Sequence, residues 1–345
     1  MATGRRLPLV AVVLEVSPGR REAGTRQVPA SRLPGRGRWV RPAARGPRSG
    51  GVRRPRLLPY LFIAPSVGLT ALFSLVPLGL AIQRSFYGGG ASSTNPFQTK
   101  LSFVGLQNYS GALSSGGTQA LEVTAIYTVG FIVLAMGFGL ATALLLNMKL
   151  PGIDRLRAPF IIPVVVPVVA TALIWANIFA PQFGFINRIL EELGLPQADF
   201  TSSPSLALIM VLTFGVWQFF GENVILYLAA LKSLPVDLME AASVDGAGAW
   251  RRFRFVRWPL LRRATAVILV ITTLTGLQTF TQIFILTNGG PNGATSTIVY
   301  QIYNDAFVRF NTGQADALAG ILFLISIVIT VIAVATVGRG SRRDA

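Results

Sequence analysis

Apolar residues along this chain gather in blocks of about twenty, long enough for a helix to cross the hydrocarbon core of a bilayer. Pro163 and Pro167 interrupt the third block, where a packed membrane helix tolerates a kink, and several Thr and Gln residues weaken the fifth. We therefore expect an all-α membrane protein with six transmembrane helices. The blocks lie at roughly 57–83, 121–147, 158–180, 206–230, 264–287 and 316–338.

The distribution of positive charge favours one orientation of these spans. If the N-terminus faces the cytoplasm, 27 Lys and Arg residues fall in inner segments and 4 in outer segments, or 13 against 4 without the N-terminal tail. Because cytoplasmic loops of membrane proteins are enriched in Lys and Arg, we expect both termini in the cytoplasm. The loop 231–263 is then cytoplasmic, and the loops 84–120, 181–205 and 288–315 face outward.

The N-terminal segment 1–56 differs in composition from the rest. It holds 14 Arg and two acidic residues, and so carries +12 of the net charge of +17. This composition predicts a disordered cytoplasmic tail with affinity for anionic membrane lipid. Nucleic-acid binding is disfavoured, because the segment lacks interleaved aromatic residues and a folded frame. The expected organisation is this tail, a membrane domain over 57–338 and a short cytoplasmic tail over 339–345.

The residues that are missing exclude several kinds of chemistry. The chain has no cysteine and no histidine, which removes thiolate nucleophiles, imidazole bases and the usual zinc sites. None of its three lysines lies in a GxxxxGK[ST] phosphate loop, so no ATP site, cofactor or metal is expected in this chain. A membrane enzyme is disfavoured, because no catalytic constellation can be assembled. A secondary transporter is disfavoured because no inverted repeat is apparent and Glu222 alone is ionisable away from the span ends.

The loop between the fourth and fifth expected spans begins with a helix signal. Pro235 suits the first turn of a helix, and Asp237 places an acid near the positive end of the helix dipole. The stretch DLMEAASVDGA then offers an alanine-rich surface with one exposed acid, before Gly246 breaks or turns the helix. Such a surface suits docking into a groove on another protein.

A second short helix is expected after this turn. Trp250, Phe253 and Val256 recur every three residues and so share one helical face, while most of the neighbouring arginines take the other. Pro259 is expected to end this helix before the fifth span. An amphipathic helix that only anchors the loop to lipid headgroups fits equally well. The residue pattern alone therefore leaves docking and anchoring open.

The loop sequence LAALKSLPVDLMEAASVDGAGAWRRFRFVRWPLL closely resembles the EAA-type loop of binding-protein-dependent ABC importer permeases. LTNGGPNGATSTIVYQIYNDAF at 286–307 and FVGLQNY at 103–109 are similar to further blocks of the carbohydrate branch of that family, which has maltose-type and glycerol-3-phosphate-type members. The resemblance covers about 57–338 and departs at Trp258, where the family usually has leucine. The matching loop positions are Glu240, Ala241, Ala242, Asp245, Gly246, Ala247, Phe253 and Pro259.

This resemblance implies a fold, a location and partners. The fold is that of a type I ABC importer permease in the bacterial cytoplasmic membrane. The partners are a second permease chain that completes a heterodimer, an ATPase dimer that holds ATP and Mg, and an extracytoplasmic solute-binding protein. In this family the EAA loop forms a coupling helix in a cleft of the ATPase. There Glu240 corresponds to an acid that meets a basic residue, and Gly246 to the glycine that turns the chain.

The fourth span supplies two candidate solute-lining residues. An acid at the depth of Glu222 is costly in a membrane, so we expect it to face the bundle interior, water or a partner. A position near enough to the inner surface to be wet is the alternative. By resemblance to maltose-type permeases, Phe219 and Glu222 fall on sugar-contacting positions, although those permeases have an aromatic residue where this chain has Glu222.

The fifth span supplies the other candidates. By the same resemblance, Thr272, Gly276 and Thr279 align with polar contact positions, and their spacing places them on one helical face. Gln278 lies beside them. The competing explanation is that Thr and Gly permit close helix packing, which is common in membrane helices.

Together these features predict a non-enzymatic permease subunit that imports a sugar, a di- or oligosaccharide. Glycerol-3-phosphate or a glycerophosphodiester is the alternative solute. A phosphate favours a cationic site, and neither the fourth nor the fifth span has an Arg or Lys at depth. A scaffold that merely docks a partner is a further alternative, which a transport assay with the partner ATPase distinguishes.

Overall fold

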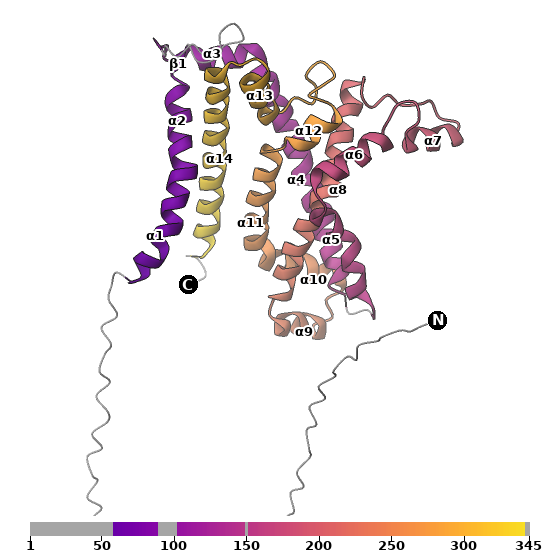
Figure 1. Ribbon diagram of the computed structural model, residues 1–345. Coiled ribbons are helices and arrows are strands. Elements are labelled where there is room, and N and C mark those ends of the chain that lie inside the picture. Colours follow the sequence, from indigo (N-terminus) through magenta and orange to yellow (C-terminus); the bar gives the residue numbers. More distant parts are fainter. Residues whose placement is uncertain (1–57, 89–101, 149–150, 342–345) are drawn as a thin grey trace, which may run out of the picture. The chain divides into compact units, whose positions relative to one another are not determined.

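The computed structural model describes residues 58–88, 102–148 and 151–341, most of which are helical (Figure 1). The predicted tail over 1–56 and residues 342–345 lie outside the described residues. The chain divides into two units after residue 58, and all the elements below belong to the second unit apart from the first residue of α1. In the described part, β1 (Tyr87–Gly88) pairs antiparallel with β2 (Ser102–Phe103).

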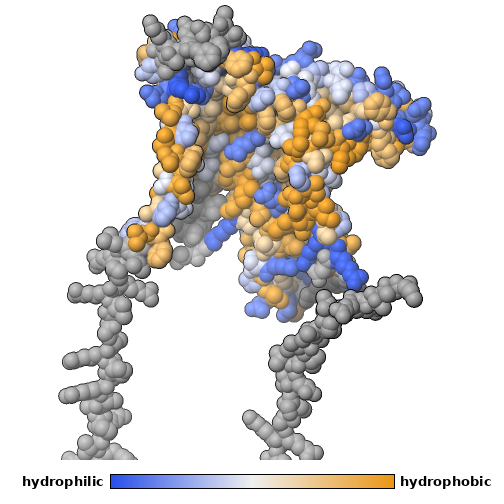
Figure 2. Space-filling model, in the orientation of Figure 1, coloured by the Kyte–Doolittle hydropathy of each residue, from blue (hydrophilic) through white to orange (hydrophobic). Residues whose placement is uncertain are grey.

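The predicted spans are all found as helices. Within the described ranges, five helices are long and apolar enough to cross a membrane, and a bent pair makes a sixth when counted as one span. In order, the spans are α1–η1–α2 (Leu58–Thr70, Ala71–Leu75, Val76–Arg84), α4 (Thr118–Leu146), α5–α6 (Arg157–Val165, Val168–Ile178), α8 (Pro204–Lys232), α11–α12 (Trp258–Leu277, Thr281–Leu286) and α14 (Thr312–Ser341). Hydrophobic side chains cover much of their surface in Figure 2.

Shorter elements connect the spans at the two ends of the bundle. We call the end that carries α3 (Gln107–Ala112) the α3 end, and the opposite end, which carries α9 (Val236–Val244), the α9 end (Figure 1). The remaining elements are η2 (Leu113–Gly117), η3 (Ile153–Leu156), α7 (Phe185–Glu192), α10 (Ala249–Arg252), η4 (Phe253–Arg257), α13 (Ile298–Tyr303) and η5 (Asn304–Val308).

The centre of the bundle is the pair α4 and α8, with α11 against α4 and α5 against α8. Two clusters of buried apolar side chains hold these helices together. One includes Tyr127, Phe131 and Phe214, and the other includes Tyr227 and Leu261. Since lipid tails are as apolar as these side chains, the association of membrane helices depends on close packing and on hydrogen bonds between helices.

Glycines mark the places where the helices approach most closely. A methyl group added at Gly221 of α8 would overlap the backbone carbonyl of Phe160 in α5. One added at Gly139 of α4 would lie 2.6 Å from Cβ of Asn223 in α8. These contacts leave no room for a side chain, so glycine sets the spacing of α8 from both neighbours.

The third span is broken rather than kinked, which corrects the expectation from its prolines. The helices α5 and α6 meet at an angle of 104°. Val166 between them has an extended backbone with ψ of 137°, and α6 begins after Pro167. A proline disfavours the helical conformation of the residue before it and cannot donate a backbone hydrogen bond. The chain therefore leaves the helix at Val166 and starts a new one.

A single amide of α8 satisfies the backbone at this break. Nε2 of Gln218 donates to the carbonyl oxygens of Pro163 at 2.5 Å and Val166 at 3.1 Å. Its Oε1 accepts a hydrogen bond of 2.7 Å from Thr171 at the start of α6. Gln218 has no exposed surface. In the middle of a membrane, carbonyl groups freed by a helix break need such partners, and Gln218 supplies them.

Replacing Gln218 by leucine is expected to destabilise the third span. The change leaves two buried carbonyl groups and the Thr171 hydroxyl without this partner, at a cost of about 1–3 kcal/mol for each unsatisfied group. We expect a lower yield and a lower melting temperature of the purified complex. The matched control is Gln197→Leu, since Gln197 is exposed in a loop. Equal melting temperatures for the two variants would contradict this role.

The fifth span continues a helix that begins near the α9 end. From Ala249 to Leu277, α10, η4 and α11 form one uninterrupted helical run. Pro259 therefore lies in the first turn of α11 and ends no helix, contrary to the prediction. The π-turn η4 explains this, because the N–H of Trp258 bonds the carbonyl of Phe253, five residues back. The wider turn accommodates a proline ring that would clash with the carbonyl four residues before it in a regular α-helix.

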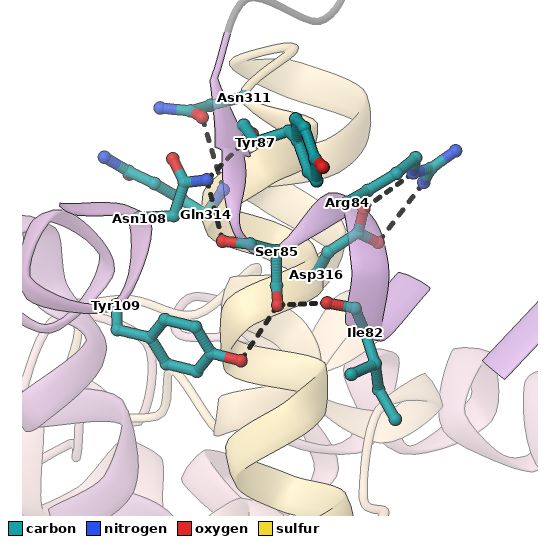
Figure 3. Close-up of polar contacts among 9 residues, drawn as sticks. All are labelled: Ile82, Arg84, Ser85, Tyr87, Asn108, Tyr109, Asn311, Gln314 and Asp316. Carbon is teal, nitrogen blue, oxygen red and sulfur yellow. Dashed lines mark hydrogen bonds and ion pairs between the residues drawn. The ribbon is translucent and has the colours of Figure 1, made fainter. Parts of the chain in front are cut away.

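The first span contacts the rest of the chain mainly through α14, and polar contacts hold it at the α3 end (Figure 3). Arg84 at the end of α2 pairs with Asp316 of α14 at 2.8 Å. Nδ2 of Asn108 donates to the backbone carbonyl groups of Ser85 and Tyr87, both at 2.9 Å. The hydroxyl groups of Ser85 and Tyr109 lie 2.8 Å apart. The FVGLQNY stretch thus contributes Asn108 and Tyr109 to this anchor.

The remainder of the first span is uncovered. None of the described side chains from Tyr60 to Arg84 is buried. Phe62 and Phe73 are 77% and 72% exposed. Since so long an apolar surface is unstable in water, lipid or another protein must cover it.

Candidate functional site

The helix α9 and the turn after it form the first candidate site, at the α9 end of the bundle. The helix has Asp237 in its first turn, as predicted, and begins at Val236, so Pro235 is its N-cap rather than a residue of the first turn. Gly246 has φ of +72°, in the left-handed region that favours glycine. The N–H of Ala247 bonds the carbonyl of Ala242, and the N–H of Gly246 bonds that of Ser243. This pair of bonds is a Schellman motif, which ends the helix and turns the chain.

The surface of α9 is small and largely exposed. Glu240, Ala241 and Asp245 are exposed, while Ala242 and Ala247 are half-buried. Val244 is 88% exposed, which is unusual for an apolar residue without a partner. The six residues predicted to contact an ATPase therefore lie together on one short helix and its turn. Whether they contact an ATPase stays a prediction.

A continuous helix joins this site to the membrane. Nη1 of Arg252 in α10 lies 3.5 Å from the hydroxyl of Ser243 in α9. The rings of Trp250 and Phe253 lie 5.7 Å apart, as expected of residues that share a helical face. From α10 the backbone runs without interruption into α11, where Leu261 is buried in the core. The turn at Gly246 therefore joins α9 to a helix that runs into the fifth span.

The solute-lining candidates of the fourth span lie half-buried in α8. Phe219 packs edge-on against Phe131 of α4, with ring centroids 6.4 Å apart. Glu222 lies one turn further along the same helix and is neither fully buried nor fully exposed. Among the described residues, no hydrogen bond or ion pair to the Glu222 carboxylate is observed. An acid in this position is free to meet a solute, water or a partner chain.

The fifth-span candidates are mostly engaged within the chain. Oγ1 of Thr272 donates to Oδ1 of Asn223 in α8 at 2.8 Å, and both side chains are buried. The hydroxyl of Thr279 accepts from Nε2 of Gln282 at 3.2 Å and lies 3.4 Å from the carbonyl oxygen of Thr275. Gln278, at the end of α11, is exposed.

Gly276 lies where α11 touches α4. A methyl group added there would lie 3.0 Å from Cγ2 of Thr128 and 3.3 Å from the ring of Phe131. Thr272, Gly276 and Thr279 are thus buried in contacts within the chain, while Phe219, Glu222 and Gln278 have exposed surface. Solute contact by any of the six stays a prediction.

Two residues that sequence reasoning missed organise this region. Phe131 contacts both Phe219 and the Gly276 position, and so links the two sets of candidates. The hydroxyl of Tyr127 accepts a hydrogen bond of 3.1 Å from Gln282, 155 residues later. Both residues belong to a predicted span that is apolar on every face. Its sequence pattern therefore does not show which side chains pack against which neighbouring helix.

Metal binding has no support in the described ranges. They contain no group of three or more His, Cys, Asp or Glu side chains arranged to hold a metal ion. The predicted absence of a cofactor stays a prediction.

Comparisons with known proteins identify close relatives. A model of the family described as "binding-protein-dependent transport system inner membrane component" matches residues 134–342. The sn-glycerol-3-phosphate transport system permease protein UgpA of Agrobacterium fabrum (strain C58 / ATCC 33970) is 34% identical over 277 residues, which cover 80% of this chain and 92% of the relative. The probable ABC transporter permease protein YesP of Bacillus subtilis (strain 168) is 32% identical over 291 residues, covering 83% and 92%.

Two solved structures share the fold. One is the crystal structure of a bacterial ABC transporter involved in the import of the acidic polysaccharide alginate, with a TM-score of 0.71 and 22% identity, covering 82% of this chain and 95% of the matched chain. The other is the bacterial alginate ABC transporter in complex with an alginate pentasaccharide-bound periplasmic protein, with a TM-score of 0.69 and 21% identity, covering 80% and 92%. Both matches show that the helices are arranged as in an ABC importer permease.

Proposed function

This chain belongs to the family of binding-protein-dependent transport system inner membrane components, and from that premise we propose that it is the permease subunit of an ATP-driven importer for a di- or oligosaccharide. The family is one of transport permeases of the inner membrane, which confirms the resemblance drawn from the loop sequence and the expected location. The solute, the partners and the orientation go beyond the family assignment and form the proposal.

The observation that carries the proposal is the construction of α9. It presents small residues and the acid Glu240 on a short exposed helix, which Gly246 closes with a Schellman motif. The helical run from Ala249 to Leu277 continues from it into the fifth span. A helix that only anchored a loop to lipid would not need a small, acid-bearing surface joined to a membrane span. We infer that α9 docks into an ATPase and transmits its movement.

The proposed partners follow from this role. An ATPase dimer binds ATP and Mg and contacts α9 from the cytoplasm. A second permease chain completes a heterodimer, and an extracytoplasmic binding protein delivers the solute. The uncovered apolar surface of the first span supports an arrangement in which lipid and a partner chain surround it.

The proposed orientation places the α9 end in the cytoplasm. The helices α10, η4 and α11 carry six arginines near this end, at Arg251, Arg252, Arg254, Arg257, Arg262 and Arg263. Positive charge next to a span favours the cytoplasmic side of the membrane. Both termini are then cytoplasmic, and the α3 end faces the binding protein.

A neutral sugar is the proposed solute. Over residues 206–230 of α8 and 264–277 of α11, the side chains include Glu222 but no Arg or Lys. A phosphate group favours a cationic site, whereas a sugar ring suits the aromatic face of Phe219 and a carboxylate acceptor at Glu222.

Glycerol-3-phosphate is the second candidate solute. It is favoured by the 34% identity to a permease named for sn-glycerol-3-phosphate transport. In this case the cation that binds the phosphate comes from the partner permease or from the binding protein. The two solutes differ in charge, which an assay on the whole transporter can resolve.

The experiment is a solute screen on the assembled transporter. The chain is co-expressed with the partner permease, the ATPase and the binding protein, and the assembled transporter is reconstituted in proteoliposomes. ATP hydrolysis and uptake are measured with maltose, longer neutral saccharides, sn-glycerol 3-phosphate and a glycerophosphodiester. We expect a neutral saccharide to stimulate both activities, and Glu222→Ala to shift its apparent affinity more than it lowers assembly.

The outcomes separate the alternatives. Stimulation only by the phosphorylated compounds would replace the sugar by the second candidate solute. ATP hydrolysis that responds to no loaded binding protein, with no uptake of any solute, would contradict the importer role and favour a scaffold.

A further inference from the structure

A polar cavity of about 320 Å³ lies at the α3 end, on the opposite side of the bundle from α9. It forms where η2, the first turn of α4, the loop 287–297, α13 and η5 meet. Its size falls at the lower end of the range for small-molecule sites. Neither α9 nor the membrane-deep candidates of the fourth and fifth spans line it, so it is separate from the sites described above.

The loop that forms one wall is rigidly built. Gly289 and Gly293 have φ of +78° and +75°, and a methyl group at Gly289 would overlap the ring of Tyr300. Tyr300 donates a hydrogen bond of 2.7 Å to the carbonyl oxygen of Asn288, and Nε2 of Gln119 donates one of 3.0 Å to that of Asn292. These contacts hold the loop against the two helices α13 and α4, so the cavity is present before any ligand arrives.

The cavity contains one charged group, and that charge is already balanced. Nη1 of Arg309 lies 3.0 Å from Oδ1 of Asp305, which is fully buried, and 3.3 Å from the carbonyl oxygen of Ser115. Nε2 of Gln301 donates to the same Asp305 oxygen at 3.1 Å. Burial raises the pKa of Asp305, while Arg309 and Gln301 act in the opposite direction. An anion therefore finds no uncompensated positive charge here.

The second oxygen of this carboxylate lacks a partner. Oδ2 of Asp305 is buried and makes no hydrogen bond with any described residue. Leaving a buried acceptor unsatisfied costs free energy. Its two neighbours Gln301 and Arg309 both line the cavity, whereas Asp305 itself is fully buried and does not line it.

The rest of the lining suits a ligand with many hydroxyl groups. The amides of Gln119, Asn292 and Asn304 and the hydroxyl of Ser296 both donate and accept hydrogen bonds. Tyr300 adds an aromatic ring, whose face suits the apolar side of a sugar ring. Amides with an aromatic wall and no net charge favour a neutral polyol over a phosphate.

We propose that this cavity is a second solute site, which binds one ring of a neutral saccharide at the α3 end before the solute enters the membrane. The chemistry of the ligand follows from the lining, while the place of the site in transport rests on the proposed function. In that orientation, the cavity lies on the face that meets the loaded binding protein.

The test measures saccharide binding by the purified transporter without its binding protein. Radiolabelled maltose is titrated by equilibrium dialysis, with sn-glycerol 3-phosphate as a competitor. Two variants alter the cavity, Ser296→Phe by filling it and Asn304→Leu by removing an amide. Neither side chain makes a hydrogen bond to another described residue, so folding should survive both changes. Ser296→Ala, which keeps the space, and Gln197→Leu, in a distant loop, are the matched controls.

We expect maltose to bind weakly, and both cavity variants to weaken binding at least about tenfold, as the loss of one or two hydrogen bonds predicts. Gln197→Leu should bind as the wild type does, Ser296→Ala should lose much less than Ser296→Phe, and sn-glycerol 3-phosphate should compete poorly. The proposal is overturned if maltose does not bind, if both variants bind normally, or if the phosphate compound competes better than maltose.

Two further readouts separate this proposal from neighbouring ones. If the cavity variants change only the affinity of the binding protein and leave maltose binding intact, the cavity receives a protein side chain and the proposal is wrong. If the cavity variants bind maltose normally while a loaded binding protein still stimulates ATP hydrolysis, the cavity proposal fails and the importer function stands. Absent stimulation with every loaded binding protein contradicts the importer function, whatever the cavity binds.

Discussion

Replacing Glu240 by arginine is expected to abolish solute uptake while the transporter still assembles in the membrane. Glu240 is exposed on α9, and its carboxylate makes no hydrogen bond or ion pair with another described residue, so the described fold does not depend on it. If it pairs with a basic residue of the ATPase, reversing its charge puts two like charges together. Breaking a buried charge pair at an interface costs about 2–5 kcal/mol, which lowers coupled uptake by a factor of at least about 30.

The measurement compares uptake, ATP hydrolysis and membrane level of the transporter in proteoliposomes. ATP hydrolysis in the variant should no longer respond to the loaded binding protein. Glu240→Gln, which removes the charge without reversing it, should have an intermediate effect. The matched control is Glu192→Arg, because Glu192 is an exposed acid on α7, away from α9. Normal uptake by Glu240→Arg would contradict docking through Glu240 and favour the alternative that α9 only anchors the loop to lipid.

The features that the sequence predicted well depend on local chemistry. The six apolar blocks gave the spans to within a few residues, because hydrocarbon thickness fixes the length of a spanning helix. The start of α9 after Pro235 and the turn at Gly246 were also predicted, because proline and glycine restrict or free the backbone at their own positions. The short exposed helix α9 and its turn follow directly from these local signals.

The features that the sequence predicted poorly depend on distant partners. Pro167 signalled an interruption, but the angle of 104° is possible because Gln218, about fifty residues later, satisfies the carbonyl groups of the break. Pro259 was expected to end a helix, whereas the wider π-turn before it makes room for the proline ring and the helix continues. The cavity at the α3 end is lined by residues far apart in the sequence, such as Ser115 and Arg309, which are almost two hundred residues apart and in contact. No local sequence pattern predicts it.

The fifth-span candidates show the same limit. Thr272 and Gly276 lie on one face of α11, as their spacing predicted, but α11 ends at Leu277, so Thr279 lies beyond the helix and that part of the prediction is wrong. The sequence also does not say which helix packs against the shared face. In the structure α4 and α8 occupy this face, with Thr128 and Asn223 as the contacts. Small and polar residues on one face of a membrane helix therefore predict that the face is in contact with something. They do not distinguish packing against another helix from binding of a solute.

Replacing Gly276 by leucine is expected to prevent stable assembly rather than to change solute preference. The first side-chain carbon alone would lie 3.0 Å from Cγ2 of Thr128 and 3.3 Å from Cα of the same residue. A leucine adds three more carbons at the contact between α11 and α4. Overpacking a close contact costs about 1–3 kcal/mol and sometimes more. The measurement is the yield and melting temperature of the purified complex, followed by solute competition on whatever protein survives.

Gly137→Leu is the matched control for this prediction. Gly137 is also a glycine of a membrane span, but an added methyl group there has no neighbour within 4 Å. Its yield and melting temperature should stay close to those of the wild type, while Gly276→Ala should fall between the two leucine variants. If Gly276→Leu assembles normally and binds solutes with altered preference, then Gly276 lines the path. The contact between α4 and α11 must in that case open during transport, since a leucine cannot fit between the helices as they stand.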